Sequence, residues 1–263
     1  MHPILFSWGP ITLRTYGAMM ALAFLGALEL ARLGARARHL PEPPLLDLSA
    51  VLVVFGLLGG RVLYVLLNWS WFAHNPLDAF KVWEGGLVFY GGFLVASAAG
   101  LWFIRRSHLP LGDVADVMAP ALAVGQAIGR WGCFFAGCCY GKPTTLPWGV
   151  RFTHPASLAP LDIPLHPVQL YESFGNLMIA FVLWLELHRH PQSRGRIFWL
   201  YVLLYAVLRL IMESLRGDDR GPTIGGLYPS QIIAILAIIV AGSIIAAMSG
   251  SGRHRPAEIV HGS

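Results

Sequence analysis

Charged residues are scarce in this chain. Aspartate, glutamate, lysine and arginine together make up 13% of its 263 residues, whereas 56% of the residues are hydrophobic. A soluble globular domain usually carries roughly a quarter charged residues. The composition therefore excludes an ordinary soluble protein and predicts an integral membrane protein.

Internal repeats, low-complexity tracts and a separate soluble domain are also lacking. The lack of a repeat argues against the many transporter folds that are built from two related halves. The first apolar run has no basic segment before it and no small-residue cleavage site after it. We therefore expect this run to be a retained span and not a signal peptide.

Seven apolar runs each approach the roughly 20 residues that a helix needs to cross a bilayer. They predict an all-α integral membrane protein, a seven-transmembrane helix bundle that residues 1–263 form as a single domain. The expected spans are about 17–33, 46–67, 87–104, 113–132, 168–187, 195–214 and 228–248. The two longer connections, 68–86 and 133–167, are rich in tryptophan and proline. We expect them to be interfacial segments on the outer side, either short helices or a small cap.

The net charge of +5 has an explanation in topology, so we expect no nucleic-acid partner. Ten arginines lie in the loops after the first, third and fifth spans and in the C-terminal tail, against six lysines and arginines on the other side. The positive-inside rule then places the N-terminus outside and the C-terminus in the cytoplasm.

Three arginines, Arg61, Arg130 and Arg209, lie within apolar runs. A charge at membrane depth is costly and usually faces a cavity or a binding site. With a rise of about 1.5 Å per residue, they lie roughly 22, 25 and 21 Å from the cytoplasmic ends of their helices, in the outer third of the membrane. Polar residues expected at the same level are Arg14, Tyr16, Tyr90, Gln169, Tyr171 and Glu172.

This cluster is expected to contain more cations than anions, which predicts an anionic ligand. Arg209, Glu213 and Arg216 share one helix face by their spacing, and Arg61 and Tyr64 are i, i+3 neighbours. In the outer leaflet the abundant anion is a phospholipid phosphate, which arginine binds with two parallel hydrogen bonds. The alternative is that each arginine pairs with a carboxylate or a carbonyl and only locks the bundle.

Ordered motifs accompany these residues. They are Gly-Gly-Arg-x-x-Tyr at 59–64, Trp-Glu-Gly-Gly at 83–86, aromatic-x-Gly-Gly at 89–92, Gly-Arg-x-Gly-x-Phe at 129–134 with Gly141 after it, His-Pro-x-Gln-Leu-Tyr-Glu at 166–172 and Tyr-x-x-x-Arg-x-x-x-Glu-x-x-Arg at 205–216. With these motifs in this order along the sequence, the chain resembles the bacterial prolipoprotein diacylglyceryl transferases. The resemblance implies an enzyme of the bacterial inner membrane. It would transfer the diacylglyceryl group of phosphatidylglycerol to the lipobox cysteine thiol near the signal peptide of a preprolipoprotein, forming a thioether and releasing glycerol phosphate.

The resemblance also implies roles for individual residues. Arg130 and Arg209 would hold the phosphate and stabilise the leaving group. The residues expected to shape the substrate pocket are Tyr16, Arg61, Tyr64, Gly141, Gln169, Tyr171, Glu172, Glu213 and Arg216.

Three positions depart from the family pattern. Tyr90 stands where the family usually has a histidine that is proposed to help activate the thiol, Cys133 replaces an asparagine, and Cys138 replaces a glutamate. His166 and Tyr90 are then the catalytic candidates for handling the thiol's proton; alternatively, His166 is a helix-entry residue before Pro167. The departures also support a second function, a related lipid transferase with a different acceptor or head group. A third alternative is a non-catalytic membrane protein that binds anionic lipid without turnover.

The three cysteines, Cys133, Cys138 and Cys139, lie within seven residues of one another. On an oxidising face Cys133 could form a disulfide with either of the other two. Nearby arginines could instead make one thiol reactive enough to carry the lipid, and a zinc site would call for a further ligand such as His154 or His166. We expect packing or a structural disulfide, with no cofactor and no bound metal.

Overall fold

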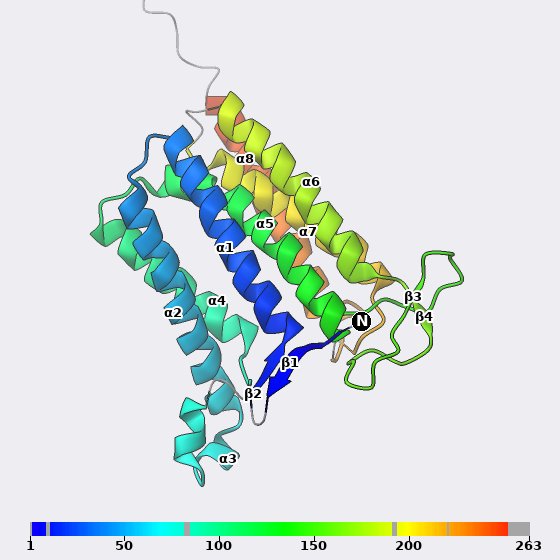
Figure 1. Ribbon diagram of the computed structural model, residues 1–263. Coiled ribbons are helices and arrows are strands. Elements are labelled where there is room, and N and C mark those ends of the chain that lie inside the picture. Colours follow the sequence, from blue (N-terminus) through cyan, green and yellow to red (C-terminus); the bar gives the residue numbers. More distant parts are fainter. Residues whose placement is uncertain (1, 9–10, 82–84, 191–193, 220, 252–263) are drawn as a thin grey trace, which may run out of the picture. The chain divides into compact units, whose positions relative to one another are not determined.

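The computed structural model describes residues 2–8, 11–81, 85–190, 194–219 and 221–251 (Figure 1). Six helices in this part of the chain are long and apolar enough to cross a membrane. They are α1 (Thr15–Ala37), α2 (Glu42–Leu67), α5 (Leu111–Ala136), α6 (Val168–Arg189), α7 (Arg196–Leu215) and α8 (Pro229–Ser251). The prediction of an all-α integral membrane protein is confirmed.

The remaining predicted span, 87–104, coincides with α4 (Phe89–Arg106). This helix has 18 residues, and they include the basic pair Arg105 and Arg106, so α4 is not among the six most apolar helices. All seven predicted spans therefore coincide with helices. Trp83 and Glu84 of the motif at 83–86 lie outside the described residues, as do Arg220 and the arginines of the C-terminal tail.

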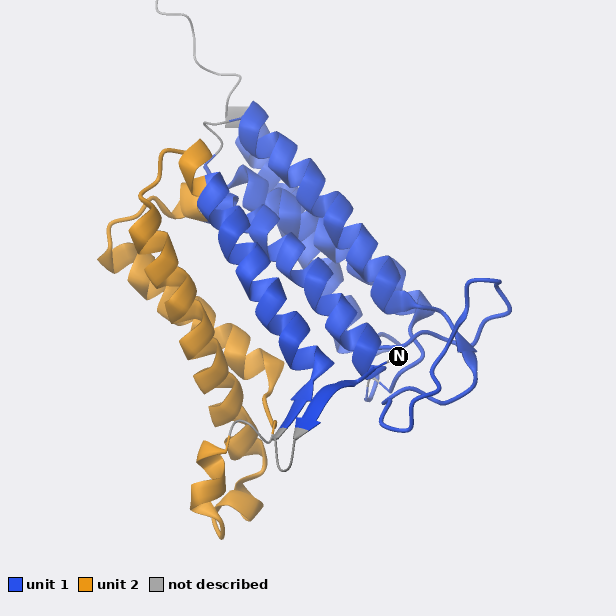
Figure 2. Ribbon diagram, in the orientation of Figure 1, with its two compact units in different colours: residues 1–34, 115–263 blue, residues 35–114 orange. Residues whose placement is uncertain are grey.

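The chain divides into two compact units, one made of residues 1–34 and 115–263 and the other of residues 35–114 (Figure 2). The smaller unit is built on α2 and α4, which pack through glycines. A Cβ atom on Gly59 would lie 2.5 Å from the carbonyl oxygen of Gly91, and one on Gly92 would lie 2.7 Å from that of Gly56. Only glycine permits such close approach of two helix backbones.

The larger unit contains α6, α7, α8 and most of α1 and α5. Small residues bring α1 against α5, since a Cβ atom on Gly26 would lie 2.9 Å from Ile128 Cδ1 and one on Gly125 would lie 3.3 Å from Ala27 Cβ. A short hairpin of β1 (Ile4–Trp8) and β2 (Ile11–Arg14), which the sequence did not predict, precedes α1.

A buried carboxylate of α5 fixes the start of α7. Asp116 is fully buried, and its two oxygens accept hydrogen bonds from the backbone N–H groups of Gly195 and Phe198, each at 3.0 Å. The first N–H groups of a helix have no partner within the helix. Asp116 on α5 supplies the missing hydrogen-bond acceptor for two of these N–H groups, and this contact fixes the position of the start of α7 on α5.

Both long connections contain regular structure in their described residues. The segment 68–86 contains the short helix α3 (Trp69–Phe72) and the 3-10 helix η1 (Pro76–Phe80). The segment 133–167 forms a small cap in which β3 (Val150–Arg151) pairs with β4 (Pro164–Leu165). Phe152, Ala159 and Leu165 form the core of this cap.

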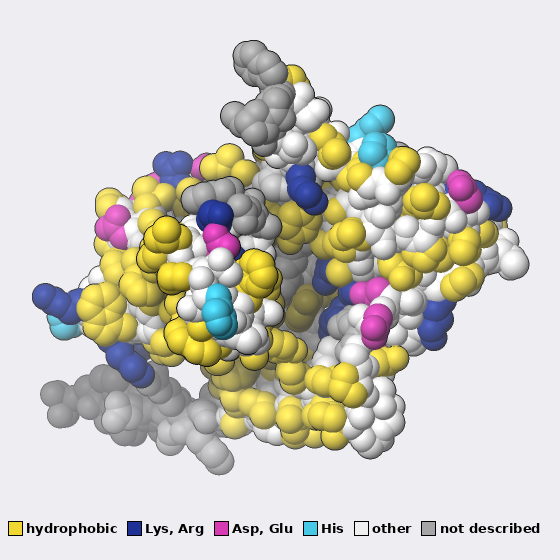
Figure 3. Space-filling model, turned by 90° about the horizontal axis from the view of Figure 1, so that it is seen from below, with side chains coloured by type: hydrophobic (Ala, Val, Ile, Leu, Met, Phe, Trp, Pro, Cys, Tyr) yellow, Lys and Arg dark blue, Asp and Glu magenta, His cyan; other side chains and the backbone are white. Residues whose placement is uncertain are grey.

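Hydrophobic side chains cover much of the face seen at the end where α5 finishes and the cap lies (Figure 3). Lysine and arginine side chains are spread over this face, and aspartate and glutamate side chains lie beside some of them (Figure 3). Such a surface suits the boundary between lipid and water.

Candidate active site

Glu172 is the centre of a charged network in the larger unit. Its side chain is buried on α6, one turn after the helix begins. Oε2 lies 2.5 Å from Nε of Arg130 on α5, and Oε1 lies 2.9 Å from Nη1 of Arg209 on α7. Nη1 of Arg216, directly after α7, lies 3.8 Å from Oε1. One carboxylate thus joins three arginines, one on α5, one on α7 and one directly after α7.

Two further carboxylates complete the network. Nη2 of Arg209 lies 3.0 Å from Oε2 of Glu213, one turn later on α7. Arg216 makes two hydrogen bonds with Asp218, from Nε at 2.8 Å and from Nη2 at 2.6 Å. The described network therefore contains as many carboxylates as guanidinium groups, whereas the sequence led us to expect an excess of cations.

The three arginines differ in how many hydrogen-bond donors remain available. Arg209 uses both of its Nη groups for carboxylates. Arg130 contacts Glu172 through Nε, and within the described part of the chain its two Nη groups make no hydrogen bond. Its side chain is still 19% exposed. Arg130 is therefore the guanidinium that can offer two parallel donors to a ligand.

Gly141 lies where three backbone segments meet. Its N–H donates to the carbonyl of His166 at 3.1 Å, and it forms an isolated β-bridge with Arg216. A Cβ atom at this position would lie 2.5 Å from the carbonyl oxygen of His166. Glycine is required here by packing, and this junction holds the cap against the ends of α6 and α7.

The start of α6 is tied to the cap by side chains. Gln169 is fully buried, and its Nε2 donates to the carbonyl of Cys138 at 2.8 Å. The hydroxyl of Tyr171 accepts a hydrogen bond from Trp148 Nε1 at 2.7 Å and lies 3.5 Å from His166 Nδ1. His166 thus lies beside the phenol of Tyr171.

Cys133, Cys138 and Cys139 form a group next to these arginines. Their Sγ atoms all lie within 4.8 Å of one another, and none of the three forms a disulfide in the structure. Hydrogen bonds from Cys133 and Cys138, together with the nearby Arg216 and Arg130, hold the pKa of the Cys139 thiol below its usual range.

Tyr16, at the start of α1, belongs to the same region. It interacts electrostatically with Arg130 and with all three cysteines. Its ring also packs close to Gly132 of α5, where a Cβ atom would lie 3.3 Å from Tyr16 Cδ2. The structure thus brings Tyr16 together with the residues of α5.

The predicted site residues of the smaller unit have a different setting. Arg61 donates four hydrogen bonds to backbone carbonyls, those of Asp78, Ala79, Gly85 and Gly86. Its guanidinium also lies 5.5 Å from the ring centroid of Tyr64. Arg61 therefore matches the expected alternative of an arginine that is satisfied by carbonyls, and it holds the connection between α2 and α4. Tyr90, the second residue of α4, is 53% exposed.

Sequence reasoning missed two participants, Asp218 and Trp148. Asp218 lies two residues after Arg216, and this proximity of opposite charges was the available signal. Trp148 lies 23 residues before Tyr171, and nothing in the sequence pairs them.

Comparisons with known proteins match this arrangement to one family. The family model of the prolipoprotein diacylglyceryl transferases matches residues 3–247. A phosphatidylglycerol-prolipoprotein diacylglyceryl transferase of Clostridium tetani is 37% identical over 241 residues, which cover 91% of this chain and 95% of the relative. Proteins with the same name are 34% identical in Parasynechococcus marenigrum (91% of each chain) and in Geobacter sulfurreducens (83% of this chain, 84% of the relative).

Proposed function

Because the chain belongs to the prolipoprotein diacylglyceryl transferase family, we propose that it is an enzyme that uses phosphatidylglycerol and a preprolipoprotein. It transfers the diacylglyceryl group to the lipobox cysteine of the preprolipoprotein. The sulfur attacks the glyceryl carbon that bears the phosphate, a carbon–sulfur bond forms, and the carbon–oxygen bond breaks. The electron pair leaves on the oxygen of glycerol phosphate.

The two Nη groups of Arg130, which make no hydrogen bond within the described residues, carry this proposal. The lipid phosphate has a single negative charge before the carbon–oxygen bond breaks and gains a second as the bond breaks. Donors already oriented toward that oxygen stabilise the transition state more than the ground state. Arg130 can bind the phosphate through both Nη groups while Glu172 holds its Nε.

Glu172 and Arg209 act as positioning residues in this scheme. The carboxylate of Glu172 is almost fully buried and holds Arg130 and Arg209 on its two oxygens. The buried ion pairs restrict the rotamers of both arginines before substrate binds. Such preorganisation lowers the cost of orienting the donors during the reaction.

The proton of the substrate thiol needs an acceptor. His166 and Tyr90 remain the proposed candidates from the sequence. His166 Nδ1 lies 3.5 Å from the hydroxyl of Tyr171. We therefore expect substitution of either residue to alter the position of the other side chain. Tyr90 is exposed at the start of α4, which leaves its hydroxyl accessible to a substrate.

We propose that the protein lies in the bacterial inner membrane with its N-terminus outside and its C-terminus in the cytoplasm. The distribution of basic residues supports this orientation. Arg130, Glu172 and the cap then belong to the outer side, where a secreted preprolipoprotein and outer-leaflet lipid are both accessible.

Turnover by the purified protein tests the proposal. The protein in detergent is given phosphatidylglycerol and a lipobox peptide, and glycerol phosphate release and peptide mass are followed together. We expect stoichiometric product that disappears in Arg130→Ala and Arg209→Ala. Folded protein that binds anionic lipid but forms no product would contradict the proposal and support a lipid-binding function.

A further inference from the structure

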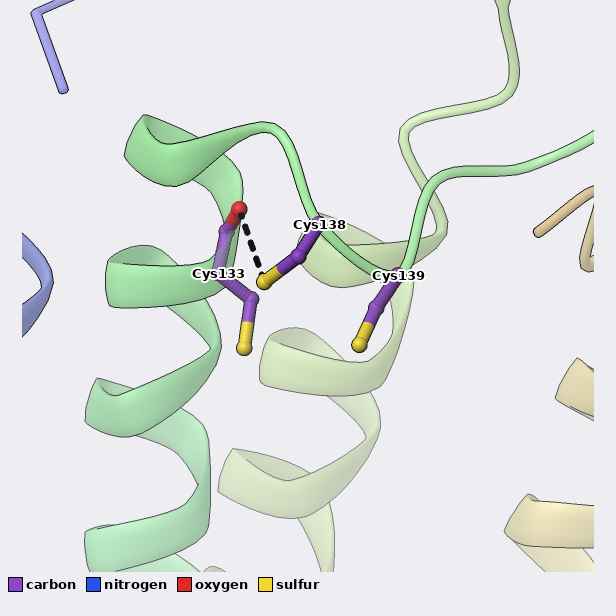
Figure 4. A group of neighbouring side chains, drawn as sticks. All are labelled: Cys133, Cys138 and Cys139. Carbon is purple, nitrogen blue, oxygen red and sulfur yellow. Dashed lines mark hydrogen bonds between the residues drawn. The ribbon is translucent and has the colours of Figure 1, made fainter. Parts of the chain in front are cut away.

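The three cysteines converge from two parts of the chain (Figure 4). Cys133 lies in the last turn of α5, and Cys138 and Cys139 follow in the loop after it. The loop is held close to the helix, since the N–H of Cys138 donates to the carbonyl of Cys133 at 3.1 Å. Gly137 and Cys139 both have positive φ, 78° and 58°, which turns the chain back and directs the third sulfur toward the other two.

The separation of the sulfurs suits a metal ion. A tetrahedral zinc ion with Zn–S bonds of about 2.3 Å holds its sulfurs roughly 3.8 Å apart. The three Sγ atoms already lie within 4.8 Å of one another, so small side-chain rotations close the site. Each cysteine is half-buried, which keeps the group within reach of an incoming ligand. A disulfide would use only two of the three sulfurs.

Among the described residues, no histidine or carboxylate joins the three thiols to complete a four-ligand set. Nδ1 of His154 accepts a hydrogen bond from the N–H of Ala156, and Nδ1 of His166 faces Tyr171. Structural zinc sites have four protein ligands, whereas catalytic sites have three and leave the fourth position to water or substrate. The group therefore has the composition of a catalytic site.

The surrounding charge favours an anionic centre. A divalent ion with three thiolates, and a fourth from a substrate, carries net negative charge. Arg130 interacts electrostatically with Cys133 and Cys139, and Arg216 with Cys139. These guanidinium groups stabilise the anionic centre, and Arg130 is also the residue that we assign to the lipid phosphate.

We propose that Cys133, Cys138 and Cys139 bind a zinc ion whose fourth position takes the sulfur of the substrate cysteine. This inference rests on the proposed function and deepens it. In this scheme water, and not His166 or Tyr90, takes the proton of the substrate thiol as its sulfur binds zinc, because a coordinating thiol is deprotonated. The zinc-bound thiolate then attacks the glyceryl carbon, the carbon–oxygen bond breaks, and glycerol phosphate leaves with the electron pair. The thioether is a weaker ligand and dissociates, and zinc keeps its oxidation state.

The zinc ion thereby performs the thiol activation that the family resemblance assigns to a histidine at the position of Tyr90. Cys133 and Cys138 are themselves two of the positions at which this chain departs from that pattern. All three departures then have one explanation, because a metal-bound thiol needs no histidine to remove its proton.

Metal content and cobalt spectroscopy test the site without using turnover. Protein purified under reducing conditions is expected to contain one zinc ion per chain. This zinc should be absent from each of the variants Cys133→Ser, Cys138→Ser and Cys139→Ser. His154→Ala is the matched control and keeps it. In Co²⁺-substituted protein we expect sulfur-to-cobalt charge-transfer absorption. A lipobox peptide shifts this spectrum, and the same peptide with serine in place of cysteine does not.

Turnover before and after metal removal separates this inference from the proposed function. We expect product formation to be lost with a chelator and restored by Zn²⁺. Full turnover by metal-free protein overturns the zinc site and leaves the transferase intact. A cobalt spectrum that the cysteine peptide does not change, or a disulfide within the group in active protein, also overturns it. A peptide-dependent cobalt shift without product at any metal content supports the zinc site and contradicts the transferase.

Discussion

Nε of Arg130 lies 2.5 Å from Oε2 of Glu172, and this ion pair joins the end of α5 to the beginning of α6. The contact engages one nitrogen of the guanidinium group and leaves Nη1 and Nη2 available. Because both residues are largely buried, removing either one would leave the other as an uncompensated buried charge.

Arg130→Lys is expected to lower kcat by roughly 100-fold or more, since a single ammonium group cannot replace two parallel donors at the phosphate. The measurement is glycerol phosphate release at saturating lipid. Arg105→Lys, at the exposed end of α4, is the matched control and should keep normal turnover. Equal rates for Arg130→Lys and the unaltered protein would remove Arg130 from the reaction.

Glu172→Gln is expected to reduce kcat by about 10- to 100-fold while KM for phosphatidylglycerol stays the same or falls. The arginines keep their charge, so lipid still binds, but their orientation is lost. Steady-state kinetics separate the two constants. Glu186→Gln on the same helix makes the same change away from the network and should leave both constants unaltered. A rise in KM alone would show that Glu172 acts in lipid binding.

Gly141→Ala is expected to destabilise the protein by about 1–3 kcal/mol. The added Cβ would lie 2.5 Å from the carbonyl oxygen of His166, and the backbone there has little room to move. Chemical unfolding in mild detergent measures the change. Gly242→Ala, where the structure has no heavy atom within 4 Å of the new Cβ, should be neutral or slightly stabilising. Similar effects of the two changes would contradict the packing argument.

Asp116→Ala is expected to cost about 1–2 kcal/mol of stability, because the first N–H groups of α7 lose their acceptor. The catalytic constants per folded molecule should not change, since Asp116 lies at the opposite end of α5 from Arg130. Unfolding and kinetics are measured on the same preparation, with the exposed Asp47→Ala as control. Lost turnover at unchanged stability would assign Asp116 a part in the reaction.

In metal-free protein, Cys139 is expected to be alkylated by iodoacetamide faster than Cys138, and the difference should widen as the pH falls. Hydrogen bonds from the other two cysteines and the nearby arginines lower the pKa of Cys139, whereas the hydrogen bonds with Cys133 and Cys139 raise the pKa of Cys138. A thiol with lowered pKa stays ionised at a pH where an ordinary cysteine, with a pKa of about 8.5, is protonated. Peptide mass spectrometry gives both rates. Faster reaction of Cys138 near neutral pH would reverse the assignment.

Much of the fold could be predicted from apolar run length alone. The predicted spans 46–67 and 168–187 correspond to the helices Glu42–Leu67 and Val168–Arg189. The helix period also predicted that Arg209 and Glu213 share a face, and their ion pair confirms it. Local geometry fixes such neighbours, since residues four apart on a helix always lie close together.

The sequence by itself determined a membrane-spanning α-helical chain, the glycines at its close helix contacts and the motifs of a family. Only the tertiary structure decided that Glu172 holds Arg130 and Arg209, which are 42 and 37 residues away along the chain. Tertiary structure alone also separates Arg61, whose guanidinium donates to four carbonyls, from Arg130, whose two Nη groups have no hydrogen-bond partner among the described residues. Hydropathy and helical period report only on a residue's own segment, whereas the partners of a buried charge are set by which helices pack together.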